Sequence, residues 1–141
     1  MHRKWSWLAL VLAAVMLLAA CSSGKDDFFR VGEDQIPTLY TAVGSKKITD
    51  TKTGFENGNS YKSVTYESVS AEDMQAYVDA LEAIGYAQVQ DTEISESGVQ
   101  TLTMGNNSVT DGKIILIRIT LDPNGQTNVL YNVNDGTIEF Y

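Results

Sequence analysis

Only a few residues of this chain have side chains suited to nucleophilic or metal chemistry. The 141 residues include one cysteine, Cys21, and one histidine, His2. A single cysteine excludes a disulfide within the chain, and this pair cannot supply the Cys/His ligand sets of zinc and copper sites. A cysteine thiolate is a good nucleophile, so the surroundings of Cys21 decide which chemistry the chain can undergo.

The first 20 residues have the composition of an export signal. Residues 2–4 are His, Arg and Lys, and the run from Trp5 to Ala20 is apolar except for Ser6. This run is shorter than the roughly 20 residues that a helix needs to cross a bilayer. A basic start, a short apolar run and small residues at its end predict a secretory signal peptide over residues 1–20. The alternative is a membrane-spanning or buried helix.

The end of this run, Leu18, Ala19, Ala20 and Cys21, resembles the bacterial lipobox. The resemblance implies that the chain is cut before Cys21, that the thiol receives diacylglycerol, and that the new amine is acylated. Two or more acyl chains make a stable anchor, whereas one binds only marginally. We therefore expect a lipid anchor on the extracytoplasmic side of the cell membrane, which in a Gram-positive bacterium is the outer face of the plasma membrane, and no other cofactor. The alternative is an unmodified buried cysteine.

Removal of residues 1–20 leaves an acidic chain without histidine. Eight basic residues then stand against 18 acidic ones, a formal charge of −10. The missing imidazole excludes Ser-His-Asp and Cys-His catalysis, and the negative charge argues against nucleic acid as a partner. Carboxylates, hydroxyls and lysines remain, so residue type alone does not exclude a carboxylate-based or Ser-Lys hydrolase.

Several short segments resemble catalytic or ligand-binding motifs, but their spacing or position does not match those motifs. The segment Gly105–Lys113 has six residues between its glycines, whereas a phosphate loop has four. Ser22–Lys25 matches Ser-x-x-Lys but lies beside the lipid attachment point. Asp111-Gly112 and Asp135-Gly136 lack the ligand spacing of an EF-hand loop, although backbone carbonyls leave a loose calcium site open as an alternative. We predict no metal site and no catalytic residue.

One segment, Ala71 to Ile84, has the features of an amphipathic helix. Ser70 is suited to cap its first amides, and Gly85 is suited to end it. Its apolar residues recur at helical spacing and predict a buried stripe, made of Met74, Tyr77, Val78, Leu81 and Ile84. The other face carries acids and no basic residue, namely Glu72, Asp73, Asp79 and Glu82. These acids are a candidate partner-docking face, and the alternative is a face that only contacts solvent.

The residues before this helix predict weaker elements. Residues 21–35 are mostly polar and predict a lipidated tether, in which Phe28 and Phe29 either begin the folded core, as we expect, or reach the membrane interface. Residues 36–43 predict a short helix that Gly44 ends. Residues 51–60 are rich in Gly, Asn and Thr and predict a loop. Residues 61–68 predict a strand.

After the helix, apolar and polar residues alternate, which is typical of strands. Strands are expected over residues 86–94, 99–104, 113–122, 126–134 and 137–141. In the strongest, Ile115, Ile117, Ile119 and Leu121 share one face, and Ile114, Leu116, Arg118 and Thr120 share the other. Short turns require antiparallel pairing. The fold class predicted is α+β, a single two-layer domain over residues 36–141 with one main amphipathic helix packed on a four- to five-stranded, mainly antiparallel sheet.

The order of strand, helix (SAEDMQAYVDALEAIGYAQV) and antiparallel meander over residues 61–141 resembles small uncharacterised lipoproteins of Gram-positive bacteria. The resemblance implies a surface module and carries over no catalytic residue. We therefore predict a membrane-anchored, non-enzymatic binding or interaction module. The alternatives are an accessory or inhibitory subunit of an envelope protein, and a small carboxylate-based cell-wall hydrolase.

Overall fold

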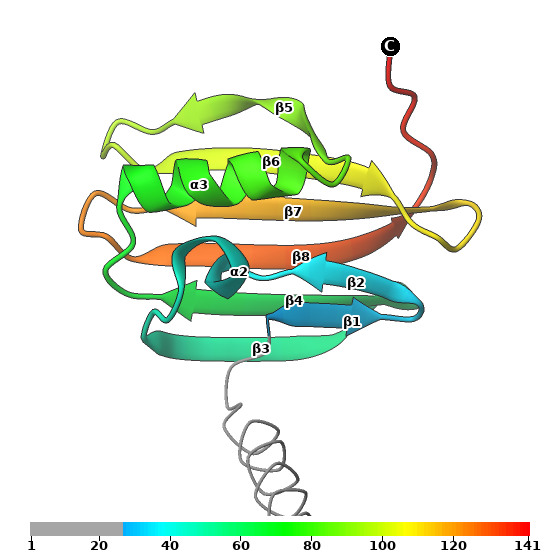
Figure 1. The fold of residues 1–141 in the computed structure, drawn as a ribbon, viewed down its shortest axis with the longest axis horizontal. Coiled ribbons are helices and arrows are strands. Elements are labelled where there is room, and N and C mark those ends of the chain that lie inside the picture. The colour runs from blue at the N-terminus through cyan, green and yellow to red at the C-terminus, as the bar shows by residue number, and fades with distance from the viewer. Residues whose placement is uncertain (1–26) are drawn as a thin grey trace, which may run out of the picture.

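The computed structural model describes residues 27–141, which form eight strands and two helices (Figure 1). The strands are β1 (Phe28–Val31), β2 (Asp34–Pro37), β3 (Ile48–Glu56), β4 (Asn59–Tyr66), β5 (Ala87–Ile94), β6 (Gln100–Asn107), β7 (Lys113–Leu121) and β8 (Thr127–Asp135). The helices are α2 (Leu39–Val43) and α3 (Ala71–Glu82).

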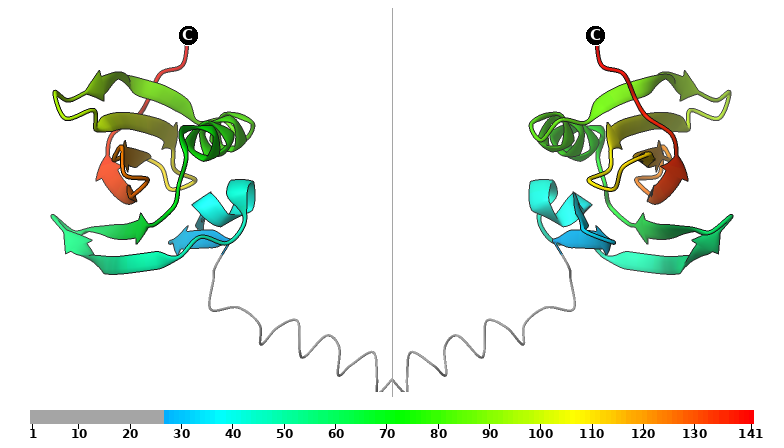
Figure 2. Two further views of the ribbon diagram at one scale, coloured as in Figure 1. Left: turned by 90° about the vertical axis from the view of Figure 1, so that its left-hand side faces the viewer. Right: turned by 90° about the vertical axis from the view of Figure 1, so that its right-hand side faces the viewer.

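Six strands form one antiparallel sheet in the order β3-β4-β8-β7-β6-β5. Strands β5 to β8 form a meander, β3 and β4 form a hairpin, and the pairing of β4 with β8 joins the two parts. Strands β1 and β2 form a separate two-stranded sheet. This hairpin and both helices lie on one side of the large sheet (Figure 1, Figure 2). We call that side the packed face and the other side the open face.

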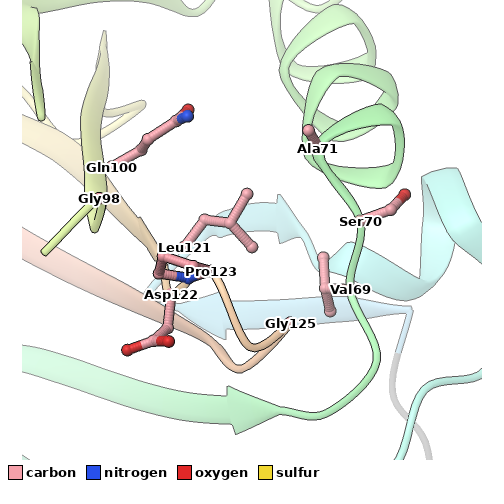
Figure 3. Close-up of a pocket in the computed structure, with 9 residues that line it drawn as sticks. All are labelled: Val69, Ser70, Ala71, Gly98, Gln100, Leu121, Asp122, Pro123 and Gly125. Carbon is pink, nitrogen blue, oxygen red and sulfur yellow. The ribbon is translucent and has the colours of Figure 1, made fainter.

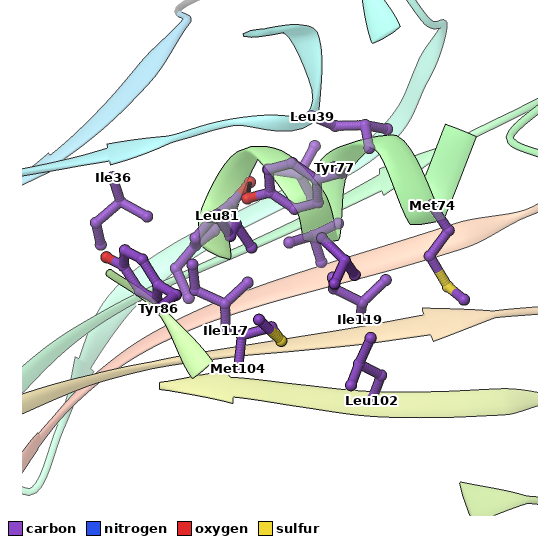
Figure 4. Packing of buried hydrophobic residues seen from close by; sticks show 14 of the residues in the cluster. Ile36, Leu39, Met74, Tyr77, Leu81, Tyr86, Leu102, Met104, Ile117 and Ile119 are labelled. Atoms are coloured by element: carbon purple, nitrogen blue, oxygen red, sulfur yellow. Dashed lines mark hydrogen bonds between the residues drawn. The ribbon is translucent and has the colours of Figure 1, made fainter. Parts of the chain in front are cut away.

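The packed face carries the hydrophobic core. Alternate residues of β7, including Ile117 and Ile119, are fully buried there. Helix α3 places Tyr77 and Leu81, also fully buried, against them, and Figure 4 shows these side chains gathered between the helix and the sheet. Burial of one such side chain contributes about 1.5–3 kcal/mol. The core therefore fixes which residues of each strand face inward.

Tyrosines fill the part of the core between the sheet, α2 and the β1-β2 hairpin. The Tyr77 hydroxyl donates a hydrogen bond of 2.7 Å to the Pro37 carbonyl, and it lies 3.3 Å from the Tyr131 hydroxyl. The Phe29 ring packs on Tyr131 with ring centroids 5.6 Å apart. Phe29 therefore packs against the folded core, as the sequence predicts, whereas Phe28 is 48% exposed. Burial of Tyr77 and Tyr131 in this cluster raises the pKa of both phenols well above the ordinary value.

The predicted helix is confirmed as α3. The Ser70 hydroxyl accepts a hydrogen bond from the Asp73 N–H at 3.0 Å, and the Asp73 carboxylate accepts one from the Ser70 N–H at 3.1 Å. This reciprocal pair satisfies two amides that would otherwise lack partners. The helix ends at Glu82, so Ile84 lies beyond the buried stripe and is 53% exposed. The expected burial of Ile84 is therefore wrong.

The predicted fold class is wrong. The chain is mostly β, with eight strands in two antiparallel sheets and two short helices, and it is not a two-layer α+β fold built on one main helix. The main cause is β3, which lies where a loop was predicted. Its side chains are almost all exposed because it is an edge strand. An edge strand exposed on both sides has no alternating apolar pattern to reveal it.

The start and end of the domain also differ from expectation. Residues 28–35 of the predicted tether contain β1 and the start of β2, and the expected short helix is reduced to α2. Gly44 does end α2, with a φ of +73°. Residues 137–141 do not form the expected last strand.

Candidate functional site

The open face of the large sheet is the surface that no helix covers, and its side chains form rows across the strands. Directly opposite residues in antiparallel strands point to the same side, so the register fixes each row. The first row is Glu93, Thr101, Thr120, Asn128, Thr65 and Asp50. The second row is Gln90, Thr103, Arg118, Leu130, Ser63 and Lys52. The third row is Ala87, Gly105, Leu116, Asn132, Tyr61 and Gly54.

Two hollows lie along the first and second rows. One has a volume of about 410 Å³ and is lined by Gln90, Asp91, Glu93, Thr103, Arg118 and Thr120, among others. The other has a volume of about 470 Å³, and its lining includes Asp50, Thr65, Thr120, Asp122 and Asn128. Because Thr120 lines both, the hollows adjoin each other. We call this combined surface the sheet-face site.

Arg118 is the cation of the sheet-face site. On β7 it stands between Thr103 of β6 and Leu130 of β8. Within residues 27–141 its guanidinium has no hydrogen bond or ion pair. A guanidinium offers five N–H donors in a plane and can bind two oxygen atoms at once. Arg118 is therefore available to a ligand that supplies oxygen acceptors.

The neighbouring polar side chains are held in place by one another. The Thr103 hydroxyl donates to Gln90 Oε1 at 3.0 Å, which orients the Gln90 amide so that its nitrogen remains a donor. The Asn128 amide donates to the hydroxyl oxygens of Ser63 at 2.8 Å and Thr65 at 3.0 Å. These bonds cross from strand to strand. The sheet-face site is therefore an ordered polar surface that can bind a ligand without rearranging its strands.

A third hollow lies at the beginning of α3 (Figure 3). It has a volume of about 260 Å³ and lies between Val69 and Ala71 on one side and Leu121 and Pro123 on the other. Its polar neighbours are engaged locally, since Asp122 accepts a hydrogen bond from the Asn124 N–H in its own turn and Ser70 caps the helix. This hollow is an apolar gap between a helix start and two turns, and it offers fewer free polar groups than the sheet-face site.

The four acids predicted on one face of α3 do not all share it. At about 100° per residue, Glu72, Asp79 and Glu82 lie together on the exposed side. Asp73 projects to the flank of the helix, where Lys46 Nζ lies 2.8 Å from its carboxylate. That ion pair brings a basic residue to the acidic region. The candidate partner-docking face is thus reduced to three acids.

The candidate lipid attachment residue Cys21 and the lipobox residues Leu18, Ala19 and Ala20 lie outside the described residues. In residues 27–141 there is no helix with the length and apolar character needed to span a membrane. The same residues contain no group of three or more His, Cys, Asp or Glu side chains placed to hold a metal ion.

No protein-family model matches this chain, and no curated protein matches its sequence.

The sequence places Arg118 on the correct face of its strand but does not identify it as a binding residue. A usable signal was present, because a single arginine interrupts an otherwise apolar strand and Thr120 follows on the same side. The remaining residues of the sheet-face site come from β4, β5, β6 and β8. The meander that brings β5, β6 and β8 beside β7 is predicted by the short turns, whereas the pairing of β4 with β8 is not.

Proposed function

We propose that this protein is a lipid-anchored, extracytoplasmic binding module without enzymatic activity, and that it binds its ligand on the sheet-face site. The ligand is polar and offers oxygen acceptors to Arg118. The unpaired guanidinium of Arg118, in a hollow on the uncovered face of the sheet, is the observation that carries the proposal.

The charge balance supports a ligand role for Arg118. The chain has 18 acidic and 10 basic residues, so a basic side chain has many acids available as partners. Lys46, Lys47, Lys52 and Lys113 each form an ion pair. Of the three described basic residues without an ion pair, Arg30 lies on β1 and Lys62 lies over the Phe29 ring, whereas Arg118 lies in a hollow that Asp91 and Glu93 also line. A free guanidinium beside ordered hydroxyl and amide groups is suited to an incoming acceptor.

The proposed anchor is compatible with access to this face. Six residue steps separate Cys21 from Asp27, and an extended chain spans at most about 22 Å over that length. The described chain enters the domain at β1, on the packed side of the sheet (Figure 2). The tether therefore joins the domain on the side away from the sheet-face site. A ligand can reach Arg118 from the envelope while the domain stays close to the membrane.

The proposal also covers the case in which the ligand is a segment of an envelope protein. The module is then an accessory or inhibitory subunit of that protein. The carboxylates of the sheet-face site do not by themselves indicate glycan hydrolysis, since a glycosidase requires two carboxyl groups on either side of one scissile bond.

Site-specific photo-crosslinking in intact cells tests this function. A photo-reactive amino acid replaces Thr120 in the full-length chain, and a matched variant carries it at Gln75, an exposed position on α3. We expect an adduct from position 120 and none from position 75. Hydrogen bonds to a charged group contribute about 1.5–3 kcal/mol, so R118A in the position-120 variant should weaken the adduct at least tenfold.

Equal adducts from both positions, no adduct from position 120, or an adduct that R118A leaves unchanged would each contradict the proposed site. Because Arg118 is exposed on the open face, its replacement leaves the core intact. Circular dichroism of the R118A variant serves as the folding control.

A further inference from the structure

The segment that follows β8 returns to the open face, at the end of the sheet away from the Arg118 hollow. Figure 1 shows it rising past the ends of β7 and β6. It forms no strand, yet one of its residues, Ile138, is held against β6 by both its side chain and its backbone. The side chain packs at Gly105, and the backbone is hydrogen-bonded to Asn107.

The side chain of Ile138 fills a notch at Gly105. A Cβ atom placed on Gly105 would lie 2.8 Å from Ile138 Cδ1 and 2.9 Å from Val89 Cγ1. It would also lie 3.2 Å from Leu116 Cδ2. The two shortest approaches are closer than real Cβ atoms show, so a larger residue at position 105 would require the Ile138 and Val89 side chains to shift. Ala87 stands opposite Gly105 on β5 and is small as well.

The backbone of Ile138 is held by a single side chain, that of Asn107. Asn107 Oδ1 accepts a hydrogen bond from the Ile138 N–H at 2.8 Å, and Asn107 Nδ2 donates to the Ile138 carbonyl at 2.9 Å. The carboxamide thus pairs with both main-chain groups of one residue, as a neighbouring strand would. Such a pair recognises an extended backbone whatever its sequence, while the notch selects a branched aliphatic side chain.

The segment is held by few contacts. Apart from Ile138, its hydrogen bond to the rest of the domain is from the Gly136 N–H to the Gly112 carbonyl, at 2.9 Å. Phe140 is 49% exposed and Tyr141 is fully exposed. A segment with one half-buried side chain, Ile138, and few backbone hydrogen bonds opens at a small fraction of the free energy of global unfolding. Another chain with the same contacts can therefore replace it.

We propose that the Gly105 notch and Asn107 form a recognition site for an extended polypeptide segment with a branched aliphatic residue, and that residues 137–141 occupy this site until a segment of a partner protein displaces them. The inference goes beyond the sheet-face ligand and does not depend on Arg118. Peptide recognition by extended backbones commonly combines main-chain pairing with a pocket for one side chain. Here both parts are present and already occupied by a segment of matching chemistry.

Occupancy by the chain's own segment lowers the apparent affinity for any other, because only the open fraction of molecules can bind. This gives a direct test with a synthetic probe, a fluorescent peptide of sequence Gly-Thr-Ile-Glu-Phe-Tyr, which copies residues 136–141. Fluorescence anisotropy is measured with the full-length chain in detergent and with its I138S variant. We expect the I138S chain to bind the peptide at least about tenfold more tightly than the native chain.

Three further variants and a control peptide test the site. In the I138S background, N107A removes the backbone contacts at an exposed position and should weaken peptide binding at least tenfold, whereas R118A should leave it unchanged. G105A places a methyl group in the notch and should weaken binding, and N107A keeps the test valid if G105A unfolds the sheet. A control peptide with serine at the isoleucine position should not bind.

Several results would overturn the proposal. They are peptide binding to I138S no tighter than to the native chain, equal binding of the serine control peptide, or binding that N107A leaves unchanged. Sedimentation equilibrium tests whether a second copy of this chain occupies the notch. A native dimer that the I138S substitution dissociates would assign the notch to a second copy of this chain instead of a partner protein.

Discussion

The carboxylate of Asp34 in β2 accepts a hydrogen bond from the hydroxyl of Ser108, which lies 74 residues later in the loop between β6 and β7. The same carboxylate accepts a second hydrogen bond from the Val109 N–H at 2.9 Å. Asp34 is buried. This one side chain therefore ties the β1-β2 hairpin to the far end of the large sheet, and it explains how two short strands outside that sheet keep their position on the packed face.

Replacement of Asp34 by alanine should destabilise the domain by about 1–3 kcal/mol, because it leaves the Val109 N–H and the Ser108 hydroxyl without their partner. D34N should cost less, since its Oδ1 can still accept from Val109. The measurement is the free energy of unfolding in urea. Equal stability of D34A and the native protein would mean that the packing of Phe29 and Ile36 and the Tyr77–Pro37 hydrogen bond hold the hairpin without Asp34.

The Asp73 carboxylate, which caps α3 together with Ser70, contributes to the stability of the fold in acid. The Lys46 ammonium, followed by the Ser70 N–H, holds the pKa of Asp73 below its usual range. A carboxylate whose pKa is lower in the folded state stabilises the fold above the unfolded value of about 3.9, and this contribution is lost as the pH falls through the folded pKa. The native protein should therefore lose more stability than D73N between about pH 5 and pH 2.5.

Urea unfolding at several pH values measures this difference, and K46M provides the matched test from the other side of the pair. K46M removes the Lys46 ammonium, which is the main cause of the lowered pKa of Asp73. Like D73N, K46M should therefore lose less stability than the native protein as the pH falls. Parallel profiles for the native protein and both variants would show that other carboxylates govern acid unfolding.

These elements mark how far the sequence predicts the fold. The helix that begins after Ser70 and the inward face of β7 are correctly predicted, since their periodic apolar residues and cap lie within one short segment. The β3-β4 hairpin was missed although Asn57 and Gly58, with φ of +52° and +78°, form the two-residue turn typical of hairpins. The polar residues of β3 concealed the strand that this turn connects to β4.

The sites were less predictable than the elements because they depend on contacts between distant segments. The row that contains Arg118 requires β4 to pair with β8, and nothing in either strand specifies that partner. Likewise, the alternating pattern of residues 137–141 is compatible with a strand. The backbone of Ile138 pairs instead with the Asn107 side chain, a contact that no local pattern indicates.

The buried tyrosines should make the domain sensitive to alkali. Burial raises the pKa of Tyr66, Tyr77 and Tyr131 well above the ordinary value of 10. Below about pH 10 the phenols are protonated in both states, and their contribution to the stability of the folded state is complete. Above about pH 10 the unfolded chain releases these protons first, so the contribution falls as the pH rises toward the folded pKa values. Unfolding in urea between about pH 8 and pH 11, followed by tyrosinate absorbance, should show stability declining as phenolate appears.

The Y77F variant removes both the hydrogen bond from Tyr77 to the Pro37 carbonyl and the titration of the Tyr77 phenol, and the two losses act at different pH. It should lower stability at neutral pH by about 1–3 kcal/mol, because the Pro37 carbonyl loses its donor. It should also reduce the alkaline decline, since one buried phenol is removed. A Y77F variant as stable as the native protein would contradict the structural role of this hydroxyl.

The proposed lipid anchor predicts the fate of Cys21. The resemblance to the lipobox implies that the Cys21 thiol receives the lipid. C21A should therefore abolish incorporation of a radiolabelled fatty acid and release the protein from the membrane fraction. S22A, at the next residue, is the matched control and should leave labelling intact. Labelling that persists in C21A, or a native product that retains its start methionine and an unmodified thiol by mass spectrometry, would exclude the anchor.

Thr127 offers a prediction in the stabilising direction. Its hydroxyl oxygen is the buried side-chain polar atom in residues 27–141 that has no hydrogen-bond partner, and the residue is 0% exposed. It stands on the packed face opposite Tyr66 of β4 and Leu121 of β7. Burying a hydroxyl without a partner costs about 1–3 kcal/mol on scales derived from protein mutations, whereas valine has nearly the same shape and no polar atom. T127V should therefore raise the urea midpoint, while T127S, which keeps the hydroxyl and removes a methyl group, should lower it. A T127V variant less stable than the native protein would contradict this prediction. It would mean that the Thr127 hydroxyl has a hydrogen-bond partner, such as an internal water molecule beside Tyr66.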